Sequence, residues 1–233
     1  MDDTDQLSDI SLQRLSTAEV VANTLMGLIV SGTLRAGEPL RENSLAKRLG
    51  ISRNSLREGI RLLEQSRLVK YEMHRGSVVS TPTIEDLEDL YRTRLHIELA
   101  AVRCVPSEEE LRQLDETFEK LKVGTTTHDL STIVAADLSL HQAIVKLLRS
   151  ERIDAFYAKV CRELVFYFTV LSRADEEYVN PQEPILARHR EIYEAVREGR
   201  RDDAAKLLEE HILQNSARLK EIMSAEGFSL TKA

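Results

Sequence analysis

One aspartate and three histidines in the second half of the chain have the residue types and the spacing of a metal site. Asp137 precedes His141 by four residues, so both side chains project from the same face of a predicted helix. His189 and His211 lie on two predicted helices joined by a turn at Gly199, about eleven residues on either side of the turn, so they can face each other. One carboxylate and three imidazoles are a typical ligand set for a first-row transition metal, with positions left open for water or an anion.

These ligand types do not select one metal. Imidazole and carboxylate accept zinc, nickel, manganese and iron alike, and zinc is the metal that we expect. Two other interpretations stay open at this point. A histidine on a helix is more often a surface residue or a hydrogen-bonded core residue than a ligand, so the four residues could form a structural cluster without metal. A bound metal could also be a permanent structural element that responds to no effector.

The sequence lacks the usual signatures of catalysis. Di-iron sites use Glu-x-x-His pairs, but positions 138, 186 and 208, three before each histidine, are all leucine. There is no glycine-rich phosphate loop and no His-Glu-x-x-His motif, and Cys104 and Cys161 both lie in apolar helical runs. A mononuclear metal hydrolase is a remote alternative, although Glu210, next to His211, points about 100° away from it around the helix axis. We therefore expect a protein that is not an enzyme.

A second set of residues has the pattern of a nucleic-acid interface. Arg53, Arg57 and Arg61 recur every four residues in a predicted helix, which gives a cationic face that begins at the helix N-terminus. The N-terminal end of a recognition helix enters the major groove of DNA, where arginine binds guanine O6 and N7. The alternative is a solvated cationic face without a partner. Further cations are expected to hold phosphates or to reach the minor groove or the backbone from a hairpin tip: Arg41, Lys47, Arg48, His74 and Arg75.

The charge of the chain is distributed unevenly. The 233 residues have a net charge of −7, yet residues 11–80 contain 11 Lys and Arg against 6 Asp and Glu, while residues 81–233 are acidic overall. Residues 1–10 contain four acids and no base, and we expect this acidic tail to be disordered. Only the basic segment is therefore expected to approach a polyanion such as DNA.

The predicted elements divide the chain at the same place. Residues 11–80 predict a winged helix-turn-helix, with helices at 17–30, 44–49 and 53–66 and strands at 68–71 and 77–80. After a linker at 81–83, residues 84–225 predict an all-α bundle with helices at 84–105, 108–123, 130–148, 151–172, 182–198 and 203–223. The expected fold is thus an N-terminal winged helix-turn-helix and a C-terminal all-α bundle of six or seven helices.

Composition narrows the protein class further. Tryptophan is absent and aromatic residues make up only 5%, which disfavours strand-rich sandwiches and barrels. Two cysteines are too few for a secreted disulfide framework, and the first residues do not resemble a signal peptide. No apolar run reaches the length of a membrane-spanning helix. We expect a cytoplasmic protein without a membrane partner.

The segment LAKRLGISRNSLREGIRLLEQSRLV, followed by HRGSVVS, resembles the DNA-binding domain of GntR-type bacterial transcription regulators. The resemblance implies that Arg53 and Arg57 contact bases or nearby phosphates. Two residues depart from the family pattern: Gly59 replaces an alanine, and Arg67 replaces the glycine that usually ends this helix, so both are expected to be unfavourable for the helix. Three residues of the matched segments complete the expected DNA-binding set: Ser52, Asn54 and Gly76.

Residues 84–223 resemble the C-terminal effector domain of the FadR-like branch of the same family, and the helix count is closest to its vanillate-regulator-like subgroup. Metal-binding members carry Asp-x-x-x-His followed by two more histidines, a pattern that ADLSLHQAIV, RHREIYEAVREGR and AAKLLEEHI match. The segment YRTRLHIELAA resembles the pattern of the first effector helix, which implies that Arg94 points into a cavity above the metal and clamps a ligand carboxylate. The alternative role of Arg94 is an ion pair with Glu98 on the helix surface.

Taken together, these expectations define a ligand-responsive bacterial transcription regulator that acts as a repressor. A homodimer would place two winged helices on a palindromic DNA operator. A small carboxylate metabolite would coordinate the metal and change the affinity for the operator. The alternative is a DNA-binding regulator whose Asp and His cluster is purely structural or metal-free.

Overall fold

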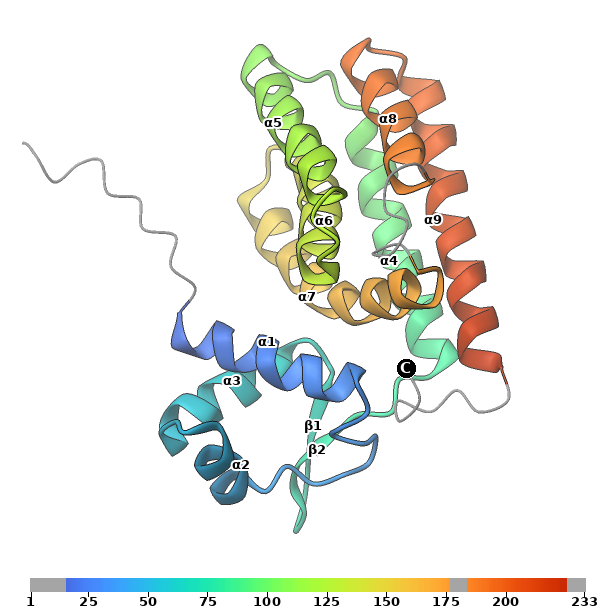
Figure 1. Cartoon of the computed structure of the whole chain (residues 1–233). Helices are drawn as coiled ribbons and strands as arrows, with labels where there is room; N and C mark the ends of the chain where they lie inside the picture. Colours follow the sequence, from blue (N-terminus) through green and yellow to red (C-terminus); the bar gives the residue numbers. More distant parts are fainter. Residues whose placement is uncertain (1–15, 177–183, 226–233) are drawn as a thin grey trace, which may run out of the picture.

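The computed structural model describes residues 16–176 and 184–225 (Figure 1). The expected acidic tail at residues 1–10 lies outside the described residues. The described elements are α1 (Thr17–Val30), α2 (Glu42–Leu49), α3 (Arg53–Gln65), β1 (Val69–Glu72), β2 (Gly76–Val79), α4 (Ile84–Val102), α5 (Glu108–Gly124), α6 (Leu130–Lys146), α7 (Glu151–Ala174), α8 (Pro184–Arg197) and α9 (Arg201–Ser224). The fold is the one expected from the sequence, a winged helix-turn-helix followed by a bundle in which six helices are described.

Caps and apolar faces define the three helices of the winged helix-turn-helix. Ser16 caps α1 in a capping box with Glu19, and Ser52 caps α3 by accepting a hydrogen bond from the Ser55 N–H. Gly50 ends α2 in the left-handed conformation. The apolar faces of α1 and α3 pack against each other. The buried core of this domain includes Leu25, Ile29, Leu56, Ile60 and Leu63.

The wing is an antiparallel hairpin of β1 and β2 in which Glu72 pairs with Gly76 beside the turn. The loop before α2 adds a third stretch of chain to it. The Gly37 N–H donates to the Val79 carbonyl at 2.9 Å, and the Val79 N–H donates to the Glu38 carbonyl at 3.0 Å. These bonds fasten the base of the wing to the body of the domain, so the tip keeps its position relative to α3.

Arg67 follows the end of α3 in a left-handed conformation, with a φ of 55°. Its N–H donates to the Glu64 carbonyl at 3.2 Å, and the Leu68 N–H donates to the Leu63 carbonyl at 3.0 Å, which is the Schellman arrangement. Glycine adopts this conformation without a steric penalty, whereas a side chain costs about 1 kcal/mol. The helix end is therefore strained, in agreement with the sequence expectation for Arg67.

We expect Arg67→Gly to raise the free energy of unfolding by about 1 kcal/mol, because it removes the strain and keeps both backbone hydrogen bonds. Arg67→Ala is the matched control, since it removes the charge that Glu163 and Asp86 experience but keeps the left-handed side chain. Urea denaturation of both variants measures the difference. An equal gain in Arg67→Ala would show that the side chain, and not the backbone, is responsible.

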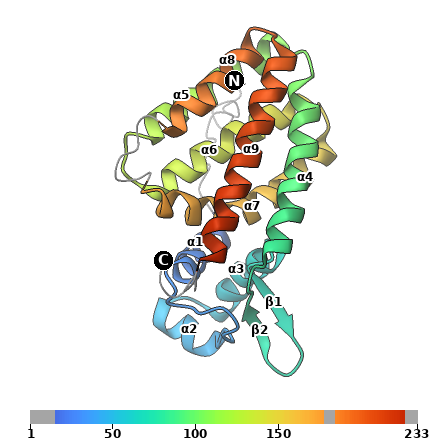
Figure 2. The ribbon, with the colours of Figure 1, turned by 90° about the vertical axis from the view of Figure 1, so that its right-hand side faces the viewer.

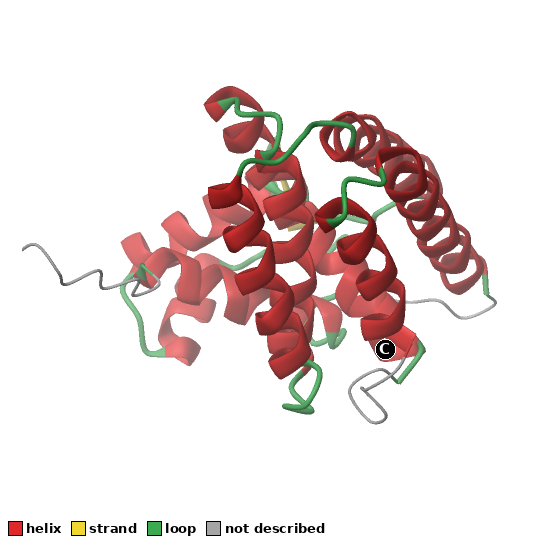
Figure 3. Cartoon of the chain, turned by 90° about the horizontal axis from the view of Figure 1, so that it is seen from above, coloured by secondary structure: helices red, strands yellow, loops and turns green. Residues whose placement is uncertain are grey.

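Six described helices, α4 to α9, form the larger domain. The capping boxes expected at two helix starts are present, Thr83 with Asp86 at α4 and Ser107 with Glu110 at α5. The long helices α4 and α9 run side by side, and α6 packs against both α5 and α7 (Figures 1 and 2). Figure 3 shows helices throughout this domain, with the strands confined to the domain beneath it. The bundle can therefore bring side chains from several helices to one buried point.

The observed helix ends differ from the predicted ones by up to three residues. Helix α4 ends at Val102 rather than at residue 105, because Pro106 disfavours helical backbone at the residue before it. Helix α9 begins at Arg201, two residues earlier than predicted. The predicted start of the fifth bundle helix, residue 182, lies outside the described residues. Gly199, with a φ of 71°, stops the chain from continuing α8, as its position in the sequence indicated.

The two domains contact each other where α1 lies against α7 (Figure 1). A cavity of about 630 Å³ at this contact is lined by both domains, including Met26 and Val30 of α1 and Val165 and Thr169 of α7. A loosely filled contact of this kind allows two domains to change their relative position. None of the helices in the described ranges is long and apolar enough to span a membrane.

Candidate functional site

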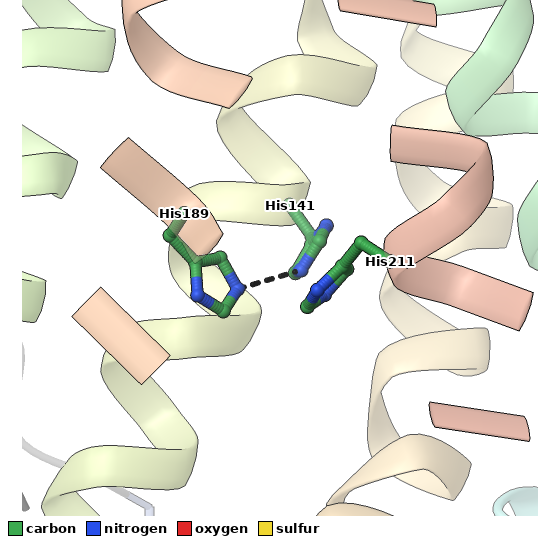
Figure 4. Close-up of side chains that lie close together, drawn as sticks. All are labelled: His141, His189 and His211. Carbon is green, nitrogen blue, oxygen red and sulfur yellow. Dashed lines mark hydrogen bonds between the residues drawn. The ribbon is translucent and has the colours of Figure 1, made fainter. Parts of the chain in front are cut away.

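Three helices bring three histidines to one point inside the bundle (Figure 4). His141 comes from α6, His189 from α8 and His211 from α9, and one ring nitrogen of each lies within 4.8 Å of the others. The Nε2 atoms of His141 and His189 are 3.3 Å apart, and the ring centroids of His189 and His211 are 4.7 Å apart. All three side chains are buried. The structure thus brings together the three histidines selected from the sequence.

Asp137 joins the cluster from the turn of α6 that precedes His141. Its Oδ1 lies 3.2 Å from His141 Nε2 and 3.1 Å from His189 Nε2. This oxygen is buried, yet it makes no hydrogen bond of normal geometry with the described part of the chain. A buried carboxylate oxygen close to two ring nitrogens but without a proper hydrogen bond is the arrangement expected around a shared cation.

Neighbouring polar groups determine which ring nitrogens face the cluster. His189 Nδ1 lies 2.7 Å from the Ile185 carbonyl. Because a carbonyl only accepts, Nδ1 carries a proton, and Nε2 is the nitrogen that can face a metal. His211 Nε2 lies 3.4 Å from the Asn215 amide nitrogen, while His211 Nδ1 is buried and has no hydrogen-bond partner among the described residues. Each of these two rings therefore has a nitrogen that can coordinate a metal.

Glu98 on α4 is a site residue that the sequence did not identify as one. Its Oε2 accepts a hydrogen bond from His141 Nδ1 at 2.7 Å, and its Oε1 accepts from Arg94 Nε at 2.6 Å and from the Tyr157 hydroxyl. A carboxylate of this kind orients a metal-ligating imidazole and raises its basicity. The Arg94–Glu98 pair is fully buried, so the expectation of a surface ion pair is wrong about its location. The only signal in the sequence was the four-residue spacing.

Arg94 extends from α4 into the same cluster. Its Nη2 lies 2.8 Å from His141 Nε2, and its Cζ lies 5.0 Å from the centroid of the Phe168 ring. The side chain is fully buried, yet Nη1 has no hydrogen-bond partner in the described ranges. An unpaired donor on a buried guanidinium is costly unless an anion completes it. Arg94 therefore pairs with Glu98, and its expected contact with a ligand carboxylate stays a prediction.

Burial and charge act in opposite directions on the cluster. Burial raises the pKa of Asp137, but the charge of His189 and the short contacts of both rings with Oδ1 outweigh it and hold this pKa well below its usual range. Burial lowers the pKa of His141, but the Glu98 carboxylate and Asp137 outweigh it and raise this pKa. Burial, together with the charges of His189 and His141, holds the pKa of His211 well below its usual range. In the metal-free cluster these shifts favour a negative Asp137, a positively charged His141 and a neutral His211.

Metal binding is expected to strengthen as the pH rises. A metal must displace the proton of His141, and because the pKa of His141 is raised above 6.5, this competition persists above that pH. Where one proton is displaced, the apparent affinity for zinc falls about tenfold for each pH unit below the pKa. Competition against a zinc chelator between about pH 6 and pH 9 measures how the apparent affinity for zinc depends on pH. An affinity independent of pH, after correction for the chelator, would contradict the assignment of His141.

The donor set fits a divalent transition metal. Three imidazole nitrogens and one carboxylate oxygen lie at the cluster, and two of these atoms, on Asp137 and His211, are buried without other partners in the described ranges. Nitrogen-rich sets with one carboxylate suit zinc, nickel, iron and manganese, and four protein ligands leave coordination positions open in a six-coordinate metal. The Arg94 guanidinium lies against the same cluster, with Nη2 2.8 Å from His141 Nε2.

The residues expected to bind DNA lie on the surface of the smaller domain. Arg57 Nε donates to Glu42 at 2.6 Å, so in the protein without DNA this arginine forms an ion pair. Arg75 binds the Glu72 carboxylate and donates to the Gly37 carbonyl at 2.7 Å, so it holds the wing and must exchange these partners to contact DNA. Gly76 is half-buried in the wing. The exposed members of the set are Arg41, Lys47, Arg48, Ser52, Arg53, Asn54, Arg57, His74 and Arg75.

The chain belongs to a known family of regulators. Residues 17–79 match the family described as bacterial regulatory proteins, gntR family, and residues 89–214, more than half of the chain, match the FCD domain. The protein is therefore a member of the GntR family with an FCD domain as its C-terminal part, which confirms the resemblance seen in the sequence.

Relatives and solved structures agree with this assignment. YdhC, an HTH-type transcriptional regulator of Bacillus subtilis strain 168, is 28% identical over 86% of this chain and 90% of its own. The gluconate operon transcriptional repressor of Bacillus licheniformis is 27% identical over 86% of this chain and 84% of its own. A crystal structure titled as a GntR transcriptional regulator from Rhodococcus sp. RHA1 has a TM-score of 0.70 and 30% identity, covering 89% of this chain and 99% of its own. The family and these relatives are transcription regulators and not enzymes.

Proposed function

We propose that this regulator is a repressor whose effector site is a metal centre held by Asp137, His141, His189 and His211. The observation that carries the proposal is the approach of Asp137 Oδ1 to two ring nitrogens, 3.1 and 3.2 Å away, at a buried point that His211 also faces. A bound zinc, or nickel, manganese or iron in its place, would supply a positive charge and open coordination positions for an anionic ligand. The protein residues around it set which ligand can enter.

A small carboxylate is the ligand class that the surrounding residues favour. Arg94 offers a buried guanidinium donor without a partner among the described residues, and guanidinium pairs well with carboxylate. Glu98 and Tyr157 hold Arg94 and His141 in place, so the donor is oriented before the ligand arrives. The relatives named as repressors of gluconate and D-xylose operons support both repression and a small oxygen-rich metabolite as the signal.

The DNA-binding part of the proposal rests on a homodimer. We divide the chain into a DNA-binding domain at 11–80, a linker at 81–83 and an effector and dimerisation domain at 84–225. Two winged helices related by a two-fold axis would match the two halves of a palindromic operator. Helix α7 supports this coupling, since it contacts α1 of the winged helix and also carries Tyr157 and Phe168 beside Arg94. A ligand that repacks this helix would change the placement of the DNA-binding domain.

Arg53→Ala is expected to lower the affinity for a specific operator at least about tenfold, because arginine at the start of a recognition helix pairs with guanine in the major groove. Fluorescence anisotropy at moderate salt, on a DNA site selected from genomic fragments, measures this affinity. Arg112→Ala is the matched control, since Arg112 is an exposed arginine on α5 in the effector domain. Retained operator affinity in Arg53→Ala would contradict the assignment of α3 as the recognition helix.

The response to effector is tested on the same operator complex. Zinc-loaded protein is titrated with a panel of small carboxylates, and the proposal predicts that at least one releases the operator. His189→Ala should bind the operator but lose this response, because the effector loses its metal. If the metal stays bound and no carboxylate changes operator affinity, the metal is a structural element, which is the alternative interpretation of the cluster.

A further inference from the structure

An ion pair joins the first residue of α2 to the middle of α3. Arg57 Nε donates to Glu42 Oε2 at 2.6 Å. Helices α2 and α3 pack against each other in the smaller domain (Figure 1). Gly50 ends α2 in the left-handed conformation and Ser52 caps α3, so the turn between the two helices has a defined geometry. The Glu42 carboxylate therefore reaches Arg57 from a fixed position on a neighbouring helix.

The ion pair uses one donor of the Arg57 guanidinium and leaves the others unused. A guanidinium carries five N–H donors, one on Nε and four on the two Nη atoms. Neither Nη atom of Arg57 makes a hydrogen bond with the part of the chain that the structure describes, and 52% of this side chain is exposed. The two Nη atoms together can meet guanine O6 and N7. Glu42 therefore fixes the orientation of the guanidinium without occupying the donors that could read a base.

Arg75 in the wing shows the opposite arrangement. Its Nη1 binds the Glu72 carboxylate, and its Nη2 donates to the Gly37 carbonyl at 2.7 Å. Both ends of this guanidinium therefore hold the wing. Arg53, at the start of α3, is exposed and forms no ion pair with the described residues. Of these three arginines, Arg57 is the one that a carboxylate orients and that still has both Nη atoms unoccupied.

The Glu42 carboxylate acts differently on a base and on a phosphate. Guanine O6 and N7 are neutral acceptors, so Arg57 can bind them while it keeps its ion pair. A phosphate is an anion, so Glu42 repels it and also neutralises the arginine that would attract it. Contacts with phosphates supply nearly all of the affinity for DNA of arbitrary sequence. Glu42 is therefore expected to weaken non-specific binding while it leaves base recognition intact.

We infer that Glu42 is a positioning residue that directs Arg57 to a guanine of the operator and away from phosphates, and so raises the specificity of DNA binding. The inference rests on the proposed function, because it takes α3 as the recognition helix. In this role Glu42 touches no base. It acts through Arg57, because an arginine that is already oriented loses less side-chain freedom when it binds.

The test compares the operator with a scrambled duplex of the same length and composition. Fluorescence anisotropy over a series of salt concentrations gives both dissociation constants for the full-length wild type, Glu42→Ala and Glu58→Ala. Glu58 is the matched control, because it is an exposed glutamate of α3 that forms no ion pair with the described residues, so its removal changes the charge equally. An exposed ion pair contributes little to stability, so all variants should melt close to the wild type.

Glu42→Ala is expected to bind the scrambled duplex about fivefold more tightly, with a salt dependence steeper by about one ion, because Arg57 is then able to bind a phosphate. The affinity for the operator should not rise, so the ratio of the two dissociation constants falls about fivefold. Glu58→Ala should keep this ratio within about twofold of the wild type, since it releases no arginine.

An Arg57→Ala background separates this role from a merely structural one. Without the arginine, Glu42 has nothing to direct, so adding Glu42→Ala should change the ratio by less than about twofold. An unchanged ratio in Glu42→Ala, or an equal fall with and without Arg57, would overturn the inference. Arg53→Ala is measured beside them. If it retains operator affinity, α3 is not the recognition helix, and this outcome would overturn the proposed function itself.

Discussion

Glu98→Ala is expected to lower the free energy of unfolding by about 3–5 kcal/mol, because it leaves a buried arginine without its counter-charge. Glu98 accepts hydrogen bonds from Arg94, His141 and Tyr157, and all four side chains are buried. Burial raises the pKa of Glu98, but Arg94 and His141 outweigh it and lower this pKa to about 2, so the carboxylate is charged under all ordinary conditions. Chemical denaturation of the metal-free protein measures the loss.

A surface glutamate and a double variant make this prediction specific. Glu119→Ala removes an exposed ion pair with Lys122 and should change stability by less than about 1 kcal/mol. Replacing Glu98 by leucine together with Arg94→Met removes both buried charges, and we expect it to recover at least half of the stability lost in Glu98→Ala. If Glu98→Ala were no more destabilising than Glu119→Ala, the buried network around His141 would not exist as described.

Gly59→Ala is expected to lower the free energy of unfolding by about 2 kcal/mol, although alanine is the better helix former. A Cβ at Gly59 would lie 2.5 Å from Val21 Cγ1 and 3.1 Å from the Ala22 backbone nitrogen. The valine can rotate only in part and the backbone cannot give way, so α1 and α3 must move apart. Thermal and urea denaturation of the variant measure the effect.

Val21→Ala should partly rescue Gly59→Ala. Alone, Val21→Ala is expected to destabilise the protein, because Val21 is 4% exposed and its removal leaves a cavity. In the Gly59→Ala background Val21 Cγ1, at 2.5 Å, is the nearest atom in the way, and Val21→Ala removes it. Val21 Cβ, at 2.8 Å, remains, so we expect part of the stability to return and the double variant to be more stable than the sum of the single effects predicts. Additive effects would mean that Gly59 does not contact Val21.

Local features of the helices could be predicted from the sequence, whereas contacts between distant segments could not. The helix caps at Thr83 and Ser107 are local signals, and they set the helix starts correctly. Gly59 could be recognised only as an unfavourable residue for a helix, because its contact with Val21 connects segments far apart in the chain. The position of Arg67 in the left-handed conformation, by contrast, follows from local backbone geometry and was visible as a departure from glycine.

In the candidate site, too, some residues could be predicted from the sequence and others could not. The spacing of Asp137, His141, His189 and His211 was sufficient to predict that they meet, because helix periodicity and a hairpin turn determine where such residues face. The burial of Glu98 was not predictable, since it depends on which face of α4 packs against α6, α7 and α9. Residues that support a metal ligand therefore emerge only once the helices are assembled.

The most direct test of the proposed effector site is the metal content per chain of untagged protein, measured by mass spectrometry for the wild type, His189→Ala and His96→Ala. His96 is an exposed histidine of α4 outside the cluster, so it controls for the loss of any histidine. The account predicts about one equivalent of transition metal in the wild type and in His96→Ala, and far less in His189→Ala. No metal in any of the three after dialysis against zinc or nickel, or equal metal in all of them, would contradict it.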